Sequence, residues 1–356
     1  MSDIEATELA AMDRAISLAA LGLGETSPNP SVGAVILDKH GTVVGEGRTA
    51  PAGGPHAEVL ALQQAGDRAR GGTAVVTLEP CNHTGRTGPC TLALHDAGIA
   101  RVVVAVTDPN PLAAGGIDTL RAAGIATTTG VRAAEAADGL RYWLTAVPRE
   151  RPYIVWKYAA TLDGRSAAAD GTSQWITSEA ARADVHRLRG TVDAIIAGVG
   201  TVLADDAHLT VRFPTEPVGN FSRRKPLRVV VDSAGRTPPD ARVRDGAAPT
   251  WIATAAEVGT ADGNRVDLHA LLKSLYARGV RGALLEGGPT LAGAFLRAGL
   301  VDEVVGYIAP KLLGAGAPAL ADAGVDTIGH AIDLELRDVT RVGPDLRLTA
   351  VPKGAR

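Results

Sequence analysis

The chain has 356 residues, enough for about two domains of ordinary size. Hydrophobic residues make up 46% and charged residues 21%, which excludes a disordered or collagen-like chain. The formal net charge of −3 and the 3% of aromatic residues give no general attraction to nucleic acid or to an acidic membrane surface, so we expect neither as a partner.

The first residues do not resemble a targeting segment. They carry Asp3, Glu5, Glu8 and Asp13 and have no apolar core of the signal-peptide type. No stretch reaches the roughly 18 apolar residues of a membrane span. We therefore expect a cytoplasmic protein, in which its two cysteines are not expected to form a structural disulfide.

Helical and strand patterns alternate along the first half. Leu9, Met12 and Ile16 recur at three- and four-residue spacing and predict a helix that runs to Ala20. Strands are then predicted over 32–37, after Gly41, and over 73–78, 101–106 and 125–129, with helices over 56–65, 90–97 and 112–123. This order predicts a sheet with helices on its faces.

A linker is predicted over 147–152, where two prolines flank three charged residues. It divides the chain into expected domains 1–147 and 152–356. In the second part we predict strands over 153–159, 194–199, 227–231, 250–253 and 283–285. Helices are predicted over 178–189, with Ser178 as N-cap, and over 268–278 and 291–298.

The strongest chemical signal is His56-Ala57-Glu58, followed by Pro80-Cys81 and then by Cys90. A catalytic zinc ion takes three protein ligands, and one imidazole with two thiolates meets that requirement. Zinc lowers the pKa of a bound water to about 7, and Glu58 would carry a proton from that water to a substrate nitrogen. The same residue pattern marks nucleobase deaminases.

Two other interpretations of these residues remain open at this point. His56 can be a helix cap and the cysteines can be thiols of the core. A closed structural zinc site is the second alternative, with His83 as the obvious fourth ligand. For the whole chain, the alternatives are a nucleic-acid-editing deaminase with an appended nucleotide-binding domain, and a non-enzymatic nucleotide sensor.

The motifs of the first half resemble the deaminase half of the bifunctional riboflavin-biosynthesis deaminase/reductase family. They are Ser27 to Gly33, His56 to Glu58, Leu78 to Cys90, and Asp108-Pro109-Asn110-Pro111. Eight residues separate the cysteines, as in that family, where other cytidine-type deaminases have two. The resemblance implies a cytidine-deaminase-like α/β/α sandwich in which Asn29, His83, Arg86 and Thr87 hold the pyrimidine and the ribose phosphate.

The chain departs from this family pattern in two places. Thr49 stands where many relatives have a histidine seven residues before the zinc histidine, and Ala113-Ala114-Gly115-Gly116 replaces a segment that usually contains Gly-Lys-Gly. Neither departure affects the residues expected to bind zinc.

The second half contains Gly287-Gly288 between a predicted strand and helix, a turn that lets a backbone approach a phosphate closely. Together with Lys157 and the segments 161–164, 173–177, 201–206, 209–212 and 232–233, it resembles the reductase half of the same family, whose α/β fold is similar to dihydrofolate reductase. The resemblance implies NADPH binding at Ala159, Trp175, Thr201, Asp205, Ser233 and the turn formed by Gly288, Pro289, Thr290, Leu291, Ala292, Gly293 and Ala294. It places the substrate at Lys157, Ser173, Arg189, Leu209, Arg212 and Glu286.

The resemblance thus implies two successive reactions on pyrimidine ribosyl phosphates. Zinc-dependent deamination of 2,5-diamino-6-(5-phosphoribosylamino)pyrimidin-4(3H)-one would be followed by NADPH-dependent reduction of the ribosyl group to ribityl. Opening of the sugar ring needs a proton donor, for which we favour Asp205 over Glu286 and Lys157. We also expect a homo-oligomer, either a dimer or a tetramer.

Overall fold

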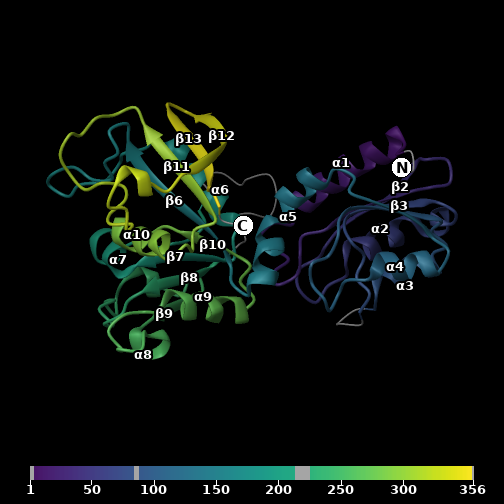
Figure 1. Cartoon of the computed structure of the whole chain (residues 1–356), viewed down its shortest axis with the longest axis horizontal. Coiled ribbons are helices and arrows are strands. Elements are labelled where there is room, and N and C mark those ends of the chain that lie inside the picture. The colour runs from purple at the N-terminus through teal and green to yellow at the C-terminus, as the bar shows by residue number, and fades with distance from the viewer. Residues whose placement is uncertain (1–3, 84–87, 213–224, 355–356) are drawn as a thin grey trace. The chain divides into compact units, whose positions relative to one another are not determined.

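The computed structural model describes residues 4–83, 88–212 and 225–354. The chain divides into two compact units, Met1–Glu150 and Arg151–Arg356, which are described separately below (Figure 1).

The first unit is built on a five-stranded sheet in the order β2-β1-β3-β4-β5. β1 is antiparallel to β2 and β3, whereas β3, β4 and β5 are mutually parallel. The strands are β1 Gly33–Leu37, β2 Val43–Arg48, β3 Thr73–Leu78, β4 Arg101–Val106 and β5 Ala126–Thr129. The helices are α1 Ala6–Ala20, α2 Ala57–Ala65, α3 Cys90–Asp96, α4 Gly116–Ala122 and α5 Ala133–Arg149, with a 3-10 turn over Gly66–Ala69.

Both faces of this sheet are buried, which explains why its central strands are continuous apolar runs. Alternate residues along β3 point to opposite sides, so that Val76 belongs to one hydrophobic cluster and Val75 to the other. Residues of α2, α3 and α4 complete the first cluster, and residues of α1 complete the second. The expected α/β/α sandwich is confirmed.

Two glycines of β2 allow α2 to lie directly against the sheet. A Cβ atom on Gly45 would lie 2.1 Å from the carbonyl oxygen of Ala61, and one on Gly47 would lie 2.2 Å from that of Ala57. No side chain fits at either position. Because His56 is the N-cap of α2, this close packing fixes the place of the histidine relative to the sheet.

The predicted linker over 147–152 is wrong in its first part. α5 continues through Pro148 to Arg149, and it ends at Glu150, whose backbone is in the left-handed region. The helix persists because Leu140, Trp143 and Ala146 are buried on one of its sides. Proline in the last turn removes one backbone donor without preventing that packing.

The second unit contains an eight-stranded sheet in the order β12-β13-β11-β6-β10-β7-β8-β9. The six strands from β11 to β9 run parallel, and β13 is antiparallel to both β11 and β12. The strands are β6 Tyr153–Thr161, β7 Ala194–Gly198, β8 Leu227–Val231, β9 Thr250–Ala253, β10 Gly282–Leu285, β11 Glu303–Ala309, β12 Leu334–Val342 and β13 Asp345–Pro352. The α-helices are α6 Glu179–Gly190, α7 Val199–Asp205, α8 Ala255–Val258, α9 Leu268–Ala277 and α10 Pro289–Arg297; short 3-10 turns cover Arg242–Arg244 and Ile328–His330.

The sequence predicts most of this second unit but not all of it. Ser178 caps α6 as expected, since its side chain accepts a hydrogen bond from the backbone N–H of Ala181. The turn expected over 288–294 is a correction: α10 begins at Pro289, two residues before the helix predicted from residue 291, so most of this segment is helix. α7, α8 and the C-terminal strands β11, β12 and β13 were not predicted, and neither was α5 of the first unit.

Within the part of the chain that the structure describes, no helix is both long enough and apolar enough to span a bilayer.

Candidate active sites

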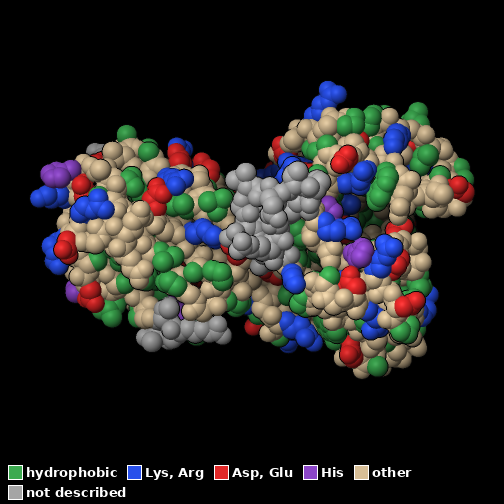
Figure 2. Space-filling view, turned by 180° about the vertical axis from the view of Figure 1, so that it is seen from behind, with side chains coloured by type: hydrophobic (Ala, Val, Ile, Leu, Met, Phe, Trp, Pro, Cys, Tyr) green, Lys and Arg blue, Asp and Glu red, His purple; other side chains and the backbone are tan. Residues whose placement is uncertain are grey.

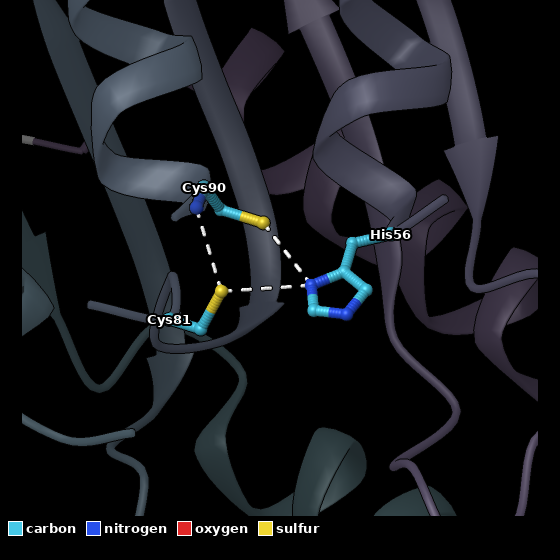
Figure 3. Close-up of side chains that lie close together, drawn as sticks. All are labelled: His56, Cys81 and Cys90. Carbon is cyan, nitrogen blue, oxygen red and sulfur yellow. Dashed lines mark hydrogen bonds between the residues drawn. The ribbon is translucent and has the colours of Figure 1, made fainter. Parts of the chain in front are cut away.

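His56, Cys81 and Cys90 come together in the first unit (Figure 3). Their candidate ligand atoms all lie within 4.8 Å of one another. The Nδ1 atom of His56 is 3.3 Å from the sulfur of Cys90 and 3.5 Å from that of Cys81. One nitrogen and two sulfurs at these separations form a donor set that suits a tetrahedral zinc ion with one open position.

The local structure explains why these side chains meet. His56 immediately precedes α2, Cys81 lies three residues beyond the end of β3, and Cys90 is the first residue of α3. The backbone N–H of Cys90 donates a hydrogen bond to the sulfur of Cys81 over 3.4 Å. Hydrogen bonds from Cys90 and His56 lower the pKa of the Cys81 thiol, so this sulfur is already suited to act as a metal ligand.

Glu58 lies in the first turn of α2 and is only 4% exposed. Burial raises the pKa of its carboxyl group. The electrostatic neighbours of Glu58 are Cys81, His56 and Cys90, so its carboxyl group faces the ligand cluster. A buried carboxyl group with a raised pKa is suited to accept and return a proton.

The structure describes two of the four residues expected to bind the pyrimidine and the phosphate. Asn29 lies in a turn, where its backbone exchanges hydrogen bonds with Thr26, and His83 is exposed two residues beyond Cys81. Arg86 and Thr87 lie outside the described residues. Thr49, at the position where relatives carry histidine, is buried and accepts a hydrogen bond from the backbone N–H of Val32.

In the second unit, Glu286 is the centre of an ion-pair cluster. The Arg189 guanidinium donates two hydrogen bonds to its carboxylate, over 2.5 and 2.9 Å, and a third to the carbonyl oxygen of Thr210 over 2.8 Å. The Nζ atom of Lys157 lies 3.8 Å from the same carboxylate. Three residues expected at the substrate therefore form one cluster around Glu286, and three of the five N–H donors of Arg189 are engaged by the protein.

This cluster shifts the pKa values of its members. Burial alone would raise the pKa of Glu286, but the charges of Arg189, Lys157 and His186 outweigh it and hold the value at about 2. Burial lowers the pKa of Lys157, and Glu286 opposes that change. A lysine with a lowered pKa beside an ionised carboxylate is a candidate for proton transfer.

Several residues expected at NADPH lie where parallel strands end. Ala159 is in the last part of β6, Thr201 follows β7, Ser233 follows β8, and Gly288 follows β10. A Cβ atom on Gly288 would lie 3.8 Å from the Oγ1 atom of Thr201, so two of these strand ends are close neighbours. The carboxyl edge of parallel strands is the usual ligand site of open α/β sheets, and the N-terminus of α10 there favours a phosphate. The residues present thus suit a dinucleotide.

Other expected residues are spread over loops of the same unit. Trp175 is exposed, and the Arg182 guanidinium lies 4.4 Å from the centre of its ring. Ser173 is partly buried in the same loop, whereas Leu209 is buried with a backbone φ of 49°. Arg212 is exposed, and its backbone N–H donates to the Nδ1 atom of His186.

Asp205 is exposed at the C-terminal end of α7. Of the segment expected to follow Gly288, Pro289 to Ala294 form the first turns of α10, in which Gly293 packs against the backbone of Asp322.

Sequence reasoning missed several polar residues near these sites. Glu79 and Asp108 are buried beside the zinc ligands, and burial raises the pKa of Asp108 to about 6, with Glu79 and Cys81 adding to the effect. His186 lies beside Arg189 and Arg212, and burial with their charges lowers its pKa to about 4. The family motifs that contain Glu79 and Asp108 could have identified these two residues. Nothing in the sequence marks His186 in the same way.

Comparisons with known proteins cover nearly the whole chain. Residues 6–106 match the cytidine and deoxycytidylate deaminase zinc-binding region, and residues 152–348 match the RibD C-terminal domain. The riboflavin biosynthesis protein RibD of Mycobacterium tuberculosis H37Rv is 49% identical over 93% of both chains, and that of Escherichia coli K12 is 44% identical over 96% of this chain and 98% of its own.

Solved structures agree with these relatives. The Acinetobacter baumannii RibD structure is 40% identical, has a TM-score of 0.88 and covers 98% of this chain and 99% of its own. A deaminase/reductase from Thermotoga maritima is 34% identical, has a TM-score of 0.87 and covers 97% of this chain and 99% of its own.

Two active-site regions on separate α/β units, one with a zinc-ligand set and one with a dinucleotide edge, define a bifunctional enzyme that joins a zinc-dependent deaminase to an NADPH-dependent reductase. The chain belongs to the RibD family of riboflavin biosynthesis proteins. This confirms the expected family, fold class, enzyme type and cofactors. The nucleic-acid-editing alternative is not favoured, because the second half matches the RibD C-terminal domain.

Proposed function

We propose that the first unit deaminates 2,5-diamino-6-(5-phosphoribosylamino)pyrimidin-4(3H)-one and that the second unit reduces the ribosyl group of the product to ribityl. The observation that carries the proposal is the cluster of His56, Cys81 and Cys90 with the buried carboxyl group of Glu58 beside it. The Thermotoga maritima relative, whose description names both of these activities, supports the choice of substrates.

In the deamination, His56, Cys81 and Cys90 would hold zinc, which when bound would supply the Lewis acidity that activates a water molecule. Glu58 takes a proton from this water and delivers it to the amino group that leaves. Water would add to the ring carbon, with its second proton going to a ring nitrogen; the exocyclic C–N bond then breaks, ammonia departs, and a carbonyl group remains on the ring. Asn29, His83, Arg86 and Thr87 are proposed to hold the pyrimidine and the phosphate.

The variant Glu58→Gln tests this assignment. We expect ammonia release to fall by about 10²- to 10⁴-fold, because the amide cannot carry the proton, while zinc stays bound and NADPH oxidation by the second unit is unchanged. Zinc is measured by atomic emission and NADPH by absorbance, so the second unit serves as an internal control. Undiminished ammonia release would show that Glu58 does not transfer the proton.

In the reduction, bound NADPH supplies a hydride to C1 of the opened sugar. Ala159, Trp175, Thr201, Asp205, Ser233 and 288–294 are proposed to hold the cofactor. Lys157, Ser173, Arg189, Leu209, Arg212 and Glu286 are proposed to hold the substrate. The position of Ala159, Thr201, Ser233 and Gly288 at the carboxyl ends of parallel strands supports the assignment of these four residues to the cofactor.

Asp205 remains our proposed proton donor for the opening of the ring, with Lys157 as the competing candidate. The lowered pKa of Lys157 and its contact with Glu286 favour the lysine, whereas Asp205 has the more open position. Single-turnover reduction by Asp205→Asn and Lys157→Met distinguishes them, because loss of the donor slows hydride transfer even at saturating NADPH.

We also propose that residues 1–147 form the deaminase domain and residues 152–356 the reductase domain. The division into compact units after Glu150 and the family match that begins at residue 152 support these limits.

A homo-oligomer, either a dimer or a tetramer, is proposed as the working form, with small molecules as its only other partners and the cytoplasm as its location. The hairpin of β12 and β13, at one edge of the second sheet, supports the proposal of a homo-oligomer. Leu334, Leu336 and Val339 of β12 are exposed, and their cross-strand partners on β13 include Ala350 and Leu348, so one face of the hairpin is apolar. A second copy of the chain would cover this face.

Surface charge supports the exclusion of nucleic acid. In the face shown in Figure 2, blue Lys and Arg side chains alternate with red Asp and Glu side chains over the described residues rather than forming one broad basic area.

A further inference from the structure

Glu79 is a buried carboxylate that the reaction outlined above does not use. It stands two residues before Cys81 and is 7% exposed. Its side chain accepts three backbone hydrogen bonds from one segment, residues 108–117. Oε2 accepts from the N–H of Asp108 over 3.0 Å, and Oε1 accepts from Gly115 and Ile117, each over 3.1 Å. One side chain thus holds both ends of that segment.

The segment 108–117 lies directly against the zinc-ligand loop. Ala113 forms a buried cluster with Cys81 and Cys90. Its carbonyl oxygen accepts a hydrogen bond from the backbone N–H of Asn82 over 3.1 Å. A Cβ atom on Gly116 would lie 1.9 Å from the carbonyl oxygen of Pro80, so only glycine permits this approach.

The same segment brings polar groups to the site. Asp108 is buried near Cys81 and His83, whose charges act on its carboxyl group, and its side chain accepts a hydrogen bond from the backbone N–H of Asn110. This segment therefore forms part of the wall next to the expected metal ligands. Its position depends on Glu79, because no other described side chain accepts hydrogen bonds from the backbone at both of its ends.

We propose that Glu79 is a positioning residue of the deaminase, which holds the segment 108–117 in register with the zinc-ligand loop and so shapes the pyrimidine site. A carboxylate suits three N–H donors because all of its lone pairs accept. An amide has one oxygen and one NH2 group, and the NH2 group would face a backbone N–H. Glu79→Gln therefore releases one end of the segment while nearly preserving the volume of the side chain.

This inference rests on the deaminase activity proposed above, and its test has a readout that is independent of that activity. In Glu79→Gln, we expect faster hydrogen exchange of the amides of Asp108, Gly115 or Ile117, with one zinc ion per chain retained. The visible spectrum of the cobalt-substituted protein should be unchanged, because the three ligands themselves remain. KM for the pyrimidine should rise roughly 10- to 100-fold, as expected for a displaced binding wall, with a smaller change in kcat and none in NADPH oxidation.

Glu8→Gln is the matched control. Glu8 is a buried carboxylate of the same unit whose partner is the side chain of Arg101, at 2.6 Å. It should lower the stability of the unit without changing KM. Gly116→Ala is the second variant, since it displaces the segment against Pro80 while Glu79 is intact. Gly116→Ala should also raise KM, and it provides the test if the Glu79→Gln protein does not fold.

The results separate the two proposals. Deaminase activity that is absent in the wild type refutes the proposed function, while hydrogen exchange still shows whether Glu79 holds the segment. An unchanged exchange rate at all three amides overturns the inference. So does a wild-type KM in both variants with zinc bound, which would make the contact purely structural. Loss of zinc from Glu79→Gln overturns it as well, and so does an altered cobalt spectrum with an unchanged KM, because Glu79 would then support the metal ligands alone.

Discussion

Replacement of Arg189 by methionine tests the ion-pair cluster of the second unit. Methionine keeps much of the length of the arginine side chain but leaves the largely buried carboxylate of Glu286 without its bidentate partner. Removing one partner of a buried pair costs about 3–5 kcal/mol, because the remaining charge is poorly solvated. Lys157 stays 3.8 Å from Glu286 and reduces the loss, so we expect about 3 kcal/mol.

The lowered pKa of Glu286 gives a similar loss of stability and shows how that loss depends on pH. A fall from its ordinary value of 4.5 to about 2 corresponds to about 3 kcal/mol of stability, at about 1.4 kcal/mol per pKa unit. Because the value is lowered in the folded protein, this stability is fully present above about pH 4.5 and is lost as the pH falls towards 2. The difference between wild type and Arg189→Met should therefore be largest near neutral pH and narrow in acid.

Scanning calorimetry of the intact chain measures this loss in the unfolding transition of the second unit. That transition is identified as the one whose Tm rises when NADPH is added. A loss of about 3 kcal/mol should lower Tm by roughly 6–12 °C for a unit of this size. Arg187→Met on the same helix is the control. Arg187 is exposed, and its partner Asp184 keeps hydrogen bonds from Tyr307 and Arg347, so the loss should be at most about 1 kcal/mol. An Arg189→Met protein no less stable than this control would refute the reasoning.

Three further predictions concern other parts of the chain. Gly47→Ala should lower the zinc content measured by atomic emission, because its Cβ atom would displace α2 and with it His56, whereas Gly139→Ala, which has open space around it, should not. Removal of zinc by a chelator should abolish ammonia release, leave NADPH oxidation intact, and be reversed by added zinc. Leu336→Asp should reduce the molar mass seen by light scattering if the apolar face of β12 joins two copies; an unchanged mass would exclude that face.

Several strands could be predicted to the residue, and the reason is local. The segments 73–78, 101–106, 227–231 and 250–253 match β3, β4, β8 and β9. Each is a short run rich in β-branched residues with glycine, proline or charged residues close to its ends. β3, β4 and most of β8 are buried on both faces, so their composition alone marks them, whereas β9 lies at the sheet edge and is only partly buried.

The elements that were not predicted have sequence patterns that do not indicate their structure, because tertiary packing determines what they form. α5 ends with Pro148 and charged residues that are typical of a linker, yet burial of Leu140 and Trp143 keeps it helical. β12 is an exposed edge strand in which charged and apolar residues mix, so neither alternation nor a buried run marks it. A register shift between Leu336 and Asp338 further disturbs its period of two.

The residues of the zinc set could be predicted, whereas the ion pair of the second unit could not. Histidine and cysteine at characteristic spacing have few other uses, so His56, Cys81 and Cys90 stand out in the sequence. Arg189 and Glu286 are 97 residues apart, and nothing in the sequence shows that they form one ion pair. Their pairing depends on how the fold brings the end of α6 to the residue that follows β10, which is a property of the folded unit.

Both sites nevertheless follow from the same property of parallel strands. In the first unit, Glu79 and Cys81 follow β3, and Asp108 follows β4, its parallel neighbour. In the second unit, Thr201, Ser233 and Glu286 follow the parallel strands β7, β8 and β10. Parallel strands bring their carboxyl ends to one edge, so polar residues that directly follow predicted strands are expected to converge there. By that rule, the strands predicted over 73–78 and 101–106 are sufficient to select Glu79 and Asp108 as neighbours of the zinc ligands.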